Sequence, residues 1–485
     1  MSLSQQALGG VLWASVERIG GKVIQFFTTI ILARILVPED FGIVAMLSIF
    51  LGISLILVDS GFSQALIRED QLSEEDKATT FYVNLFTALV LSVLLWIGAP
   101  YISAFFDEVI LVNLTRFMSL IPIFYSITII QRAYYIHKIN FRTQAIINLI
   151  ASFLSGISSV ILAWKGFGVW AIAAQQVLMV FVTSFLFWGV NPWFPKGFIN
   201  TDSFKKLFRF GSNLMLAGLI NLIFIEIYKV IIGRLYTTQL LGFYAQAENI
   251  KNVVSKNLTD IMVRVTYPTL SKVKDDINRL KDGYRKILGV ISIIIFPAMI
   301  GMILVAEPMI VTLIGEKWLD AVPILKLLAI SGMINHLHAV NLNILKVVNR
   351  SDLILKVTII KRFGIAIAIV IGLYFGFWGL IIAQVVSQFL TLFVNLYYTS
   401  ILINYSKMDQ FLDVFPLVLY CIPMIGVVLG LDLIVYSSEL IQLIVLVLAG
   451  IITYLATCIL IKPKPFKELI YILRPKFPVF KKIKI

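Results

Sequence analysis

The chain has 485 residues, of which 59% are hydrophobic and only 14% are charged, and its mean hydropathy is +0.93. A soluble domain of this length cannot bury so much apolar surface, and a disordered chain needs low hydrophobicity, so neither class fits. Lysine and arginine outnumber aspartate and glutamate by 41 to 27, which gives a net charge of +14. These values indicate a polytopic membrane protein with basic cytoplasmic loops rather than a nucleic-acid-binding protein.

Windows of about 20 mostly apolar residues, the length that crosses a bilayer, recur along the whole chain. They predict an all-α integral membrane protein with about fourteen transmembrane helices, at 9–33, 41–58, 80–98, 111–131, 145–164, 168–189, 208–233, 241–263, 287–305, 319–343, 353–373, 377–398, 412–435 and 440–461. An even number of spans places both termini on one side. Loops on that side are strongly basic, whereas the opposite loops carry only Arg34, Lys165, Arg234 and Lys317. We therefore expect both termini to be cytoplasmic, and we expect no removable signal peptide.

Two short sequences recur at nearly the same spacing, which indicates an internal repeat. The segment at 31–45 (ILARILVPEDFGIVA) matches 231–245 (IIGRLYTTQLLGFYA), and GVWAIAAQQV at 168–177 matches GFWGLIIAQV at 376–385. The spacing equals six predicted helices, an even number, so the copies run in parallel across the bilayer and form two lobes around a shared cavity. The expected parts are an N-terminal lobe at 1–190, a cytoplasmic linker at 191–206, a C-terminal lobe at 207–400, two further helices at 401–463 and a basic cytoplasmic tail at 464–485.

Motifs of common enzymes are missing from the sequence. It contains no G-x-x-x-x-G-K-[ST], no H-E-x-x-H and no G-x-S-x-G. His336 and His338 are two residues apart and do not share a helix face, so a metal pair is not expected, and His137 is remote in sequence. We therefore predict no catalytic residue, no metal site and no cofactor.

Polar residues in the first predicted helix form a stripe. Arg18, Lys22 and Gln25 recur, together with Ser15 and Thr29, at spacings of three and four, which places them on one helix face. A charge inside a span costs about 2.5–3.5 kcal/mol on insertion scales and usually has a function. The stripe must face an aqueous cavity or another helix, where a buried ion-pair network would only hold helices together. Glu17 flanks the stripe and can partly neutralise it.

Other charged residues lie in spans of the second half. Glu226 and Lys229 are spaced i,i+3, so they can either pair with each other or line a cavity. Lys361 and Arg362 form a further cationic site. Because cations exceed anions over all spans, the expected cargo is anionic. A diphosphate fits, since several lysine and arginine charges offset its desolvation.

Residues 32–46 (LARILVPEDFGIVAM) and 59–70 (DSGFSQALIRED) resemble the opening signature of bacterial polysaccharide flippases of the Wzx type. That family shares a superfamily with the lipid II flippases and the multidrug and toxin extruders. Residues 241–254 (LGFYAQAENIKNVV) are similar to the family's second-lobe segment. The resemblance implies a flippase that moves undecaprenyl-diphosphate-linked oligosaccharide repeat units across the bacterial inner membrane by alternating access, for O-antigen, capsule or exopolysaccharide synthesis.

The resemblance also implies roles for individual residues. Cations of a central cavity would bind the lipid diphosphate, and the positions that carry this role over are Arg18, Lys22, Gln25, Lys229 and Lys361. Glu17 and Glu226 are the candidates for coupling to H⁺ or Na⁺. Membrane lipids and the polysaccharide polymerase machinery are the expected partners, with no nucleic acid. Three alternatives remain open: a small-solute or drug antiporter of the same fold, a lipid II flippase, and a membrane polysaccharide polymerase or glycosyltransferase.

Overall fold

The computed structural model describes residues 3–69, 72–138, 140–434 and 436–474, without the side chains of 3–12, 14, 15, 18, 261–265, 351, 472 and 473. Helices and their connections make up this described part, and it contains no β-strand. Contacts between residues divide the chain into two units, Met1–Ala245 and Gln246–Ile485, with the boundary inside helix α10. The prediction of an all-helical fold is therefore confirmed.

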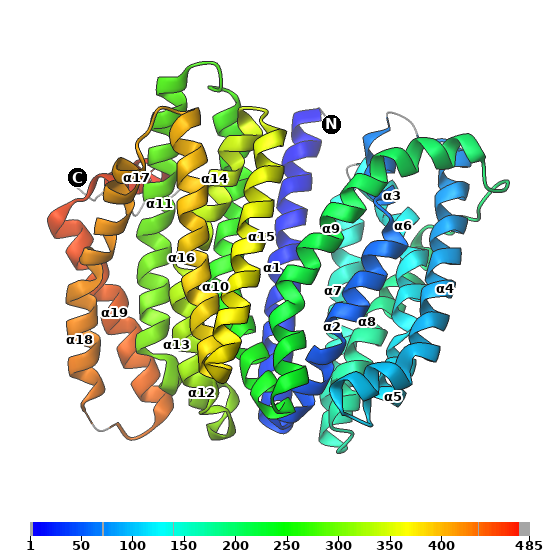
Figure 1. The fold of residues 1–485 in the computed structure, drawn as a ribbon, viewed down its shortest axis with the longest axis horizontal. Coiled ribbons are helices and arrows are strands. Elements are labelled where there is room, and N and C mark those ends of the chain that lie inside the picture. Colours follow the sequence, from blue (N-terminus) through cyan, green and yellow to red (C-terminus); the bar gives the residue numbers. More distant parts are fainter. Residues whose placement is uncertain (1–2, 70–71, 139, 435, 475–485) are drawn as a thin grey trace. The chain divides into compact units, whose positions relative to one another are not determined.

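The first unit contains nine helices and the start of a tenth among its described residues (Figure 1). They are α1 (Leu3–Ile35), α2 (Pro38–Asp59), α3 (Phe62–Arg68), α4 (Glu74–Phe106), α5 (Leu111–Met118), α6 (Leu120–His137), α7 (Phe141–Trp164), α8 (Val169–Val190), α9 (Thr201–Leu235) and the first residues of α10 (Thr238–Ser271). Within this unit α1 packs against α7, and α9 packs against α2, α3 and α4.

The sequence of α2 explains both of its ends. Pro38 occupies the first turn, where its missing N–H costs nothing, and the carboxylate of Asp40 accepts a hydrogen bond from the backbone N–H of Val37 at 3.3 Å. At the other end Ser60 and Gly61 have left-handed backbone angles, with φ of 48° and 72°. Glycine adopts this conformation without strain, so α2 stops and α3 begins in a new direction.

The internal repeat is visible as a reciprocal contact between the starts of α2 and α10. A Cβ on Gly42 would lie 1.9 Å from the carbonyl oxygen of Thr238, and a Cβ on Gly242 would lie 1.9 Å from the carbonyl oxygen of Pro38. These four residues are pairs of equivalent positions in the repeat. Only glycine permits so close an approach of two backbones, so the repeated glycine is explained by this crossing.

The second unit contains the rest of α10 and the helices that follow it. These are α11 (Ile277–Leu304), α12 (Ala306–Ile314), η1 (Glu316–Trp318), α13 (Ala321–Gly332), α14 (Asn335–Val347), α15 (Ser351–Tyr374), α16 (Gly376–Leu402), α17 (Lys407–Val414), η2 (Phe415–Cys421), α18 (Ile422–Asp432), α19 (Glu439–Ile461) and α20 (Lys464–Leu473). Helices α15 and α16 form one close pair, and α18 and α19 form another. Figure 1 shows both pairs as neighbouring helices.

Eleven helical segments of the described residues are long and apolar enough to cross a membrane, which confirms a multi-pass membrane protein. The predicted number of fourteen is not confirmed by this measure, because α1, α10 and α15 are not among the eleven. Two predicted spans are each divided into two helices: 111–131 falls on α5 and α6, and 319–343 falls on α13 and α14. Apolar windows alone do not register such breaks, because the chain stays hydrophobic through them.

The start of the predicted basic tail is a short helix, α20, packed against α11. Phe466 and Ile470 of this helix are buried. Gly289 of α11 provides the space, since a Cβ there would lie 2.8 Å from Pro465. The apolar side chains of this segment therefore contact the protein itself. Residues 475–485 lie outside the described part.

Candidate functional site

One side of α1 is occupied by α7. Glu17 Oε1 accepts a hydrogen bond from Asn148 Nδ2 at 2.5 Å. A Cβ on Gly20 would meet the side chain of Leu149, and the buried Thr28 lies against Gly156. These contacts define the side of α1 that is committed to packing within the first unit.

The polar stripe of α1 lies on a different side of the helix. Lys22 and Gln25 are exposed in the first unit. At 100° per residue they point about a third of a turn away from the side that contacts α7. No ion pair of Lys22 with another described residue is found, so its charge is available to a ligand. The side chain of Arg18 lies outside the described part.

A charged cluster joins α9 to α2 in the first unit. Lys229 Nζ donates to Glu226 Oε2 at 3.0 Å, and Ser48 Oγ donates to the same oxygen at 2.6 Å. The side chains of Lys229 and Glu226 are only 16% and 12% exposed. From the sequence, Glu226 and Lys229 could either pair with each other or line a cavity. The structure contains the pair, and the charge of Glu226 balances that of Lys229.

A second polar cluster, in the second unit, surrounds Lys361 of α15. Lys361 Nζ lies 3.3 Å from His338 Nδ1 on α14, and Asn395 Nδ2 on α16 lies 2.7 Å from the same nitrogen. His338 Nε2 lies 3.1 Å from the backbone oxygen of Gln388. No carboxylate forms an ion pair with Lys361 among the described residues. This cluster contrasts with the α9 cluster, in which an acid is present.

The sequence did not single out three neutral residues that contact these titratable side chains. Ser48, Asn148 and Asn395 are neutral polar residues in apolar helices, and their partners are far away in sequence; Ser48 and Glu226 are 178 positions apart. No local spacing marks such residues. The spacing in the sequence bears only on whether His338 belongs to a metal pair, and its contact with Lys361 depends on how α14 and α15 pack.

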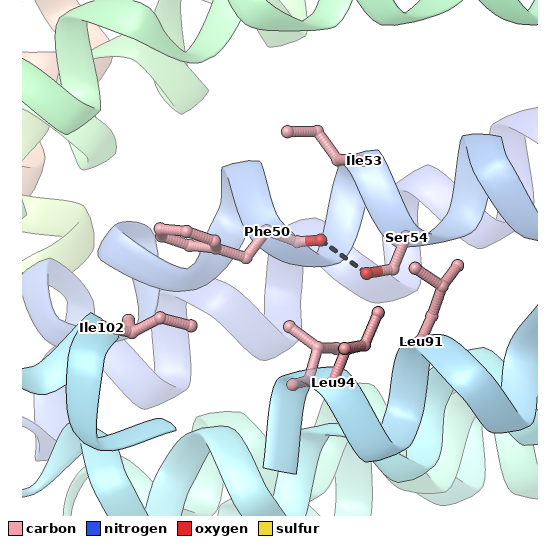
Figure 2. Close-up of a pocket in the computed structure, with 7 residues that line it drawn as sticks. Phe50, Ile53, Ser54, Leu91, Leu94 and Ile102 are labelled. Carbon is pink, nitrogen blue, oxygen red and sulfur yellow. Dashed lines mark hydrogen bonds between the residues drawn. The ribbon is translucent and has the colours of Figure 1, made fainter. Parts of the chain in front are cut away.

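Two cavities lined by described residues of the first unit do not include Lys22, Gln25 or Lys229. One, of about 220 Å³, lies between α2 and α4 and is lined by Phe50, Ile53, Ser54, Leu91, Leu94, Leu95 and Ile102 (Figure 2). The hydroxyl of Ser54 donates to the backbone oxygen of Phe50 at 2.8 Å, which leaves an apolar lining. The other, of about 450 Å³, includes Lys206, which already binds Glu69 at 2.6 Å.

Comparison with solved structures defines the class of fold. The chain is similar to the lipid II flippase MurJ in an inward closed conformation, with a TM-score of 0.76, 15% identity, and coverage of 93% of this chain and 98% of that one. It is also similar to a MATE transporter in the bent conformation, with a TM-score of 0.51, 17% identity, and coverage of 83% and 96%. The protein therefore has the fold shared by a lipid flippase and the MATE transporters, as predicted.

The family follows from the sequence comparisons. Residues 31–323 match a family described as polysaccharide biosynthesis protein, and since this is more than half of the chain, the chain belongs to that family. It is 28% identical to the teichuronic acid biosynthesis protein TuaB of Bacillus subtilis, over 73% of each chain. It is 24% identical to the lipopolysaccharide biosynthesis protein WzxC of Escherichia coli, over 81% of this chain and 82% of WzxC. The resemblance noted at residues 32–46 and 59–70 is confirmed.

Proposed function

We propose that this protein is a flippase for undecaprenyl-diphosphate-linked oligosaccharide repeat units in the synthesis of a surface polysaccharide. The observation that carries the proposal is the match of residues 31–323 to a polysaccharide biosynthesis family in a chain with the fold of a lipid flippase. A relative with 26% identity, ExoT of Rhizobium meliloti, is described as a succinoglycan biosynthesis transport protein, which favours transport over sugar transfer. The protein is thus a transporter and not an enzyme.

Transport is by alternating access of two lobes. The sequence repeat assigns residues 1–190 to one lobe and 207–400 to the other, joined by a linker at 191–206. Residues 401–463 add two helices and 464–485 form a basic tail. The site of action is the bacterial inner membrane, with both termini cytoplasmic, because the basic loops lie on the N-terminal side. Membrane lipids hold the polyprenyl chain, and a polysaccharide polymerase receives the product.

The diphosphate binds to cations on the lobe helices. In this role we place Arg18, Lys22 and Gln25 on the first helix, Lys229 on α9 and Lys361 on α15. Lys22 and Gln25 support the assignment because they are exposed away from α7, whereas a purely structural network would occupy them. Charge-assisted hydrogen bonds from several donors compensate for removing the diphosphate from water.

The two acids of these helices are the candidates for ion coupling. Glu17 is held by Asn148, and Glu226 by Lys229 and Ser48. A diphosphate that attracts Lys229 competes with Glu226 for the same ammonium group, so cargo binding would release the carboxylate for H⁺ or Na⁺. This exchange of partners would couple binding of the anionic cargo to binding of H⁺ or Na⁺.

The test is complementation of a strain that lacks the gene. The deletion should accumulate undecaprenyl-diphosphate oligosaccharide inside the cell and lose surface polymer, and the wild-type gene should restore both. The double variant Lys22→Ala with Lys229→Ala should insert normally yet fail to restore polymer. Its matched control, Lys196→Ala with Lys274→Ala, removes the same charge from exposed cytoplasmic loops and should complement fully. A normal lipid pool with intact polymer in the deletion strain contradicts the function, and full complementation by the first variant contradicts the site.

A further inference from the structure

Two basic groups of the second unit, Lys361 and His338, contact each other. Lys361 lies near the middle of α15. An ammonium group in a membrane-spanning helix normally has a carboxylate partner or backbone carbonyls around it. Here the hydrogen-bond partner is an imidazole nitrogen, Nδ1 of His338, at 3.3 Å.

The contacts of His338 determine where its hydrogen lies. Nε2 is 3.1 Å from the backbone carbonyl of Gln388, which only accepts hydrogen bonds, so Nε2 carries the hydrogen. Nδ1 is 2.7 Å from Asn395 Nδ2 and 3.3 Å from Lys361 Nζ, both of which donate. The imidazole is therefore neutral and Nδ1 is an acceptor. One proton lies between Nζ and Nδ1.

The surrounding charges oppose a second proton on the pair. The charged or titratable groups that act on Lys361 and His338 are Arg362 of the same helix as Lys361 and His336 of the same helix as His338. The helix α11 presents Ser292 to His336, at 2.7 Å, and α16 contributes the neutral Asn395.

The other helices that pack around this cluster carry further cations and acids. Helix α13 packs on α16 and carries Lys326. Helix α10 contacts α14 through Ser255 and Asn335, and it carries Glu248, Lys251, Lys256 and Asp260. Helix α17 also packs on α16 and carries Asp409 and Asp413. None of these carboxylates forms an ion pair with Lys361 among the described residues. Even one positive charge on the pair is thus poorly compensated, since desolvation and like charges both disfavour it.

From these contacts we infer that the His338–Lys361 pair is a proton-binding site that holds its proton more tightly when an anion is present. The inference rests on the proposed function, because the anion is the cargo diphosphate. In the empty protein the pair exchanges its proton with water, because no carboxylate pairs with Lys361 among the described residues. When the diphosphate arrives, its negative charge favours the protonated form, so the pair takes up as much as one proton.

The exchange needs no other reactant. A proton from water binds Nζ of Lys361, which becomes an ammonium and donates to Nδ1 of His338; on release of the cargo the N–H bond breaks and the proton returns to water through Nζ or Nδ1. The amide of Asn395 can turn to present its oxygen when Nδ1 carries the proton. Guanidinium groups do not behave in this way, because arginine stays protonated in proteins.

The test compares lysine with arginine at one position. Binding of undecaprenyl diphosphate to the purified full-length protein is measured by calorimetry at one pH in two buffers with different ionisation enthalpies, which gives the number of protons taken up. The wild type should take up as much as one proton more than Lys361→Arg, which carries a permanent charge. Raising the pH by one unit should weaken wild-type binding up to tenfold more than it weakens binding to Lys361→Arg. His137→Gln, whose histidine instead contacts the backbone of Glu69, is the control and should match the wild type.

Equal proton uptake by wild type and Lys361→Arg would overturn the inference. Absence of binding to the wild type would instead overturn the proposed function, so a second measurement examines the pair without cargo. The chain has only 3 histidines, which makes ¹⁵N-histidine NMR of the intact protein assignable with single variants. For the cargo-free protein the inference predicts a neutral His338 with hydrogen on Nε2 and none on Nδ1, and a His338 that carries hydrogen on both nitrogens at neutral pH would overturn it.

Discussion

Lys229 of the first unit and Lys361 of the second are both half-buried lysines of long helices, but their partners differ. Lys229 binds the carboxylate of Glu226 at 3.0 Å, and Ser48 binds the same carboxylate. Lys361 binds the imidazole of His338 and has no ion pair among the described residues. The first arrangement keeps the lysine charged, whereas the second lets the charge leave. The chemical type of the partner, more than the degree of burial, therefore determines whether such a lysine can exchange a proton.

The largest expected effect comes from removing the acid of the first cluster. Glu226→Ala leaves the ammonium of Lys229 partly buried without its carboxylate, and breaking such a pair from one side costs about 3 kcal/mol. The free energy of unfolding in detergent micelles should fall by that amount. Glu307→Ala, which removes an exposed acid from the first turn of α12, is the control and should cost less than about 1 kcal/mol. Equal losses for the two variants would show that the Glu226 pair adds no stability.

The two lysines should respond in opposite directions to replacement by methionine. Lys229→Met leaves the carboxylate of Glu226 without its cation, so stability should fall by about 2 kcal/mol. Lys361→Met removes a poorly compensated charge and keeps the volume, so stability should stay the same or increase. Thermal unfolding of the two purified variants beside the wild type measures this difference directly. A similar loss in both would contradict the distinction drawn between the clusters.

The smallest effect is expected at Ser48, which supplies a neutral hydrogen bond to Glu226. Ser48→Ala removes this bond at a cost of about 1 kcal/mol, because the ion pair to Lys229 remains. Combining it with Glu226→Ala should cost less than the sum of the two single changes, since the hydroxyl then bonds only the backbone oxygen of Ala45. A strictly additive double variant would mean that Ser48 acts through a different contact.

Much of the fold could be predicted from sequence because membrane helices have a strong local signal. Apolar windows located the positions of the long helices, and the residues around Gly42 and Gly242 revealed the repeat. Breaks within apolar stretches were not predictable, since a window of about 20 residues averages over the boundary between α13 and α14. The predicted number of fourteen spans is not confirmed, because α1, α10 and α15 are not among the eleven apolar segments of the described residues.

The candidate site was harder to predict from the sequence, because only its charged members have a strong local signal. Charges in apolar helices are conspicuous, so Lys22, Glu226 and Lys361 were found at once. Their partners Ser48 and Asn395 are neutral, and the contacts they make depend on how helices pack. Sequence reasoning thus identified the charged half of each cluster, and three-dimensional structure was needed for the neutral half.

The crossing of α2 and α10 has a consequence for how this gene can change. Gly42 and Gly242 occupy equivalent places in the two repeats, and each faces a carbonyl that belongs to the other copy. Neither copy can gain a side chain at this point without pushing on its counterpart. Substitutions at Gly42 and Gly242 are therefore coupled to the backbone of the opposite copy, although most other positions of the two copies differ.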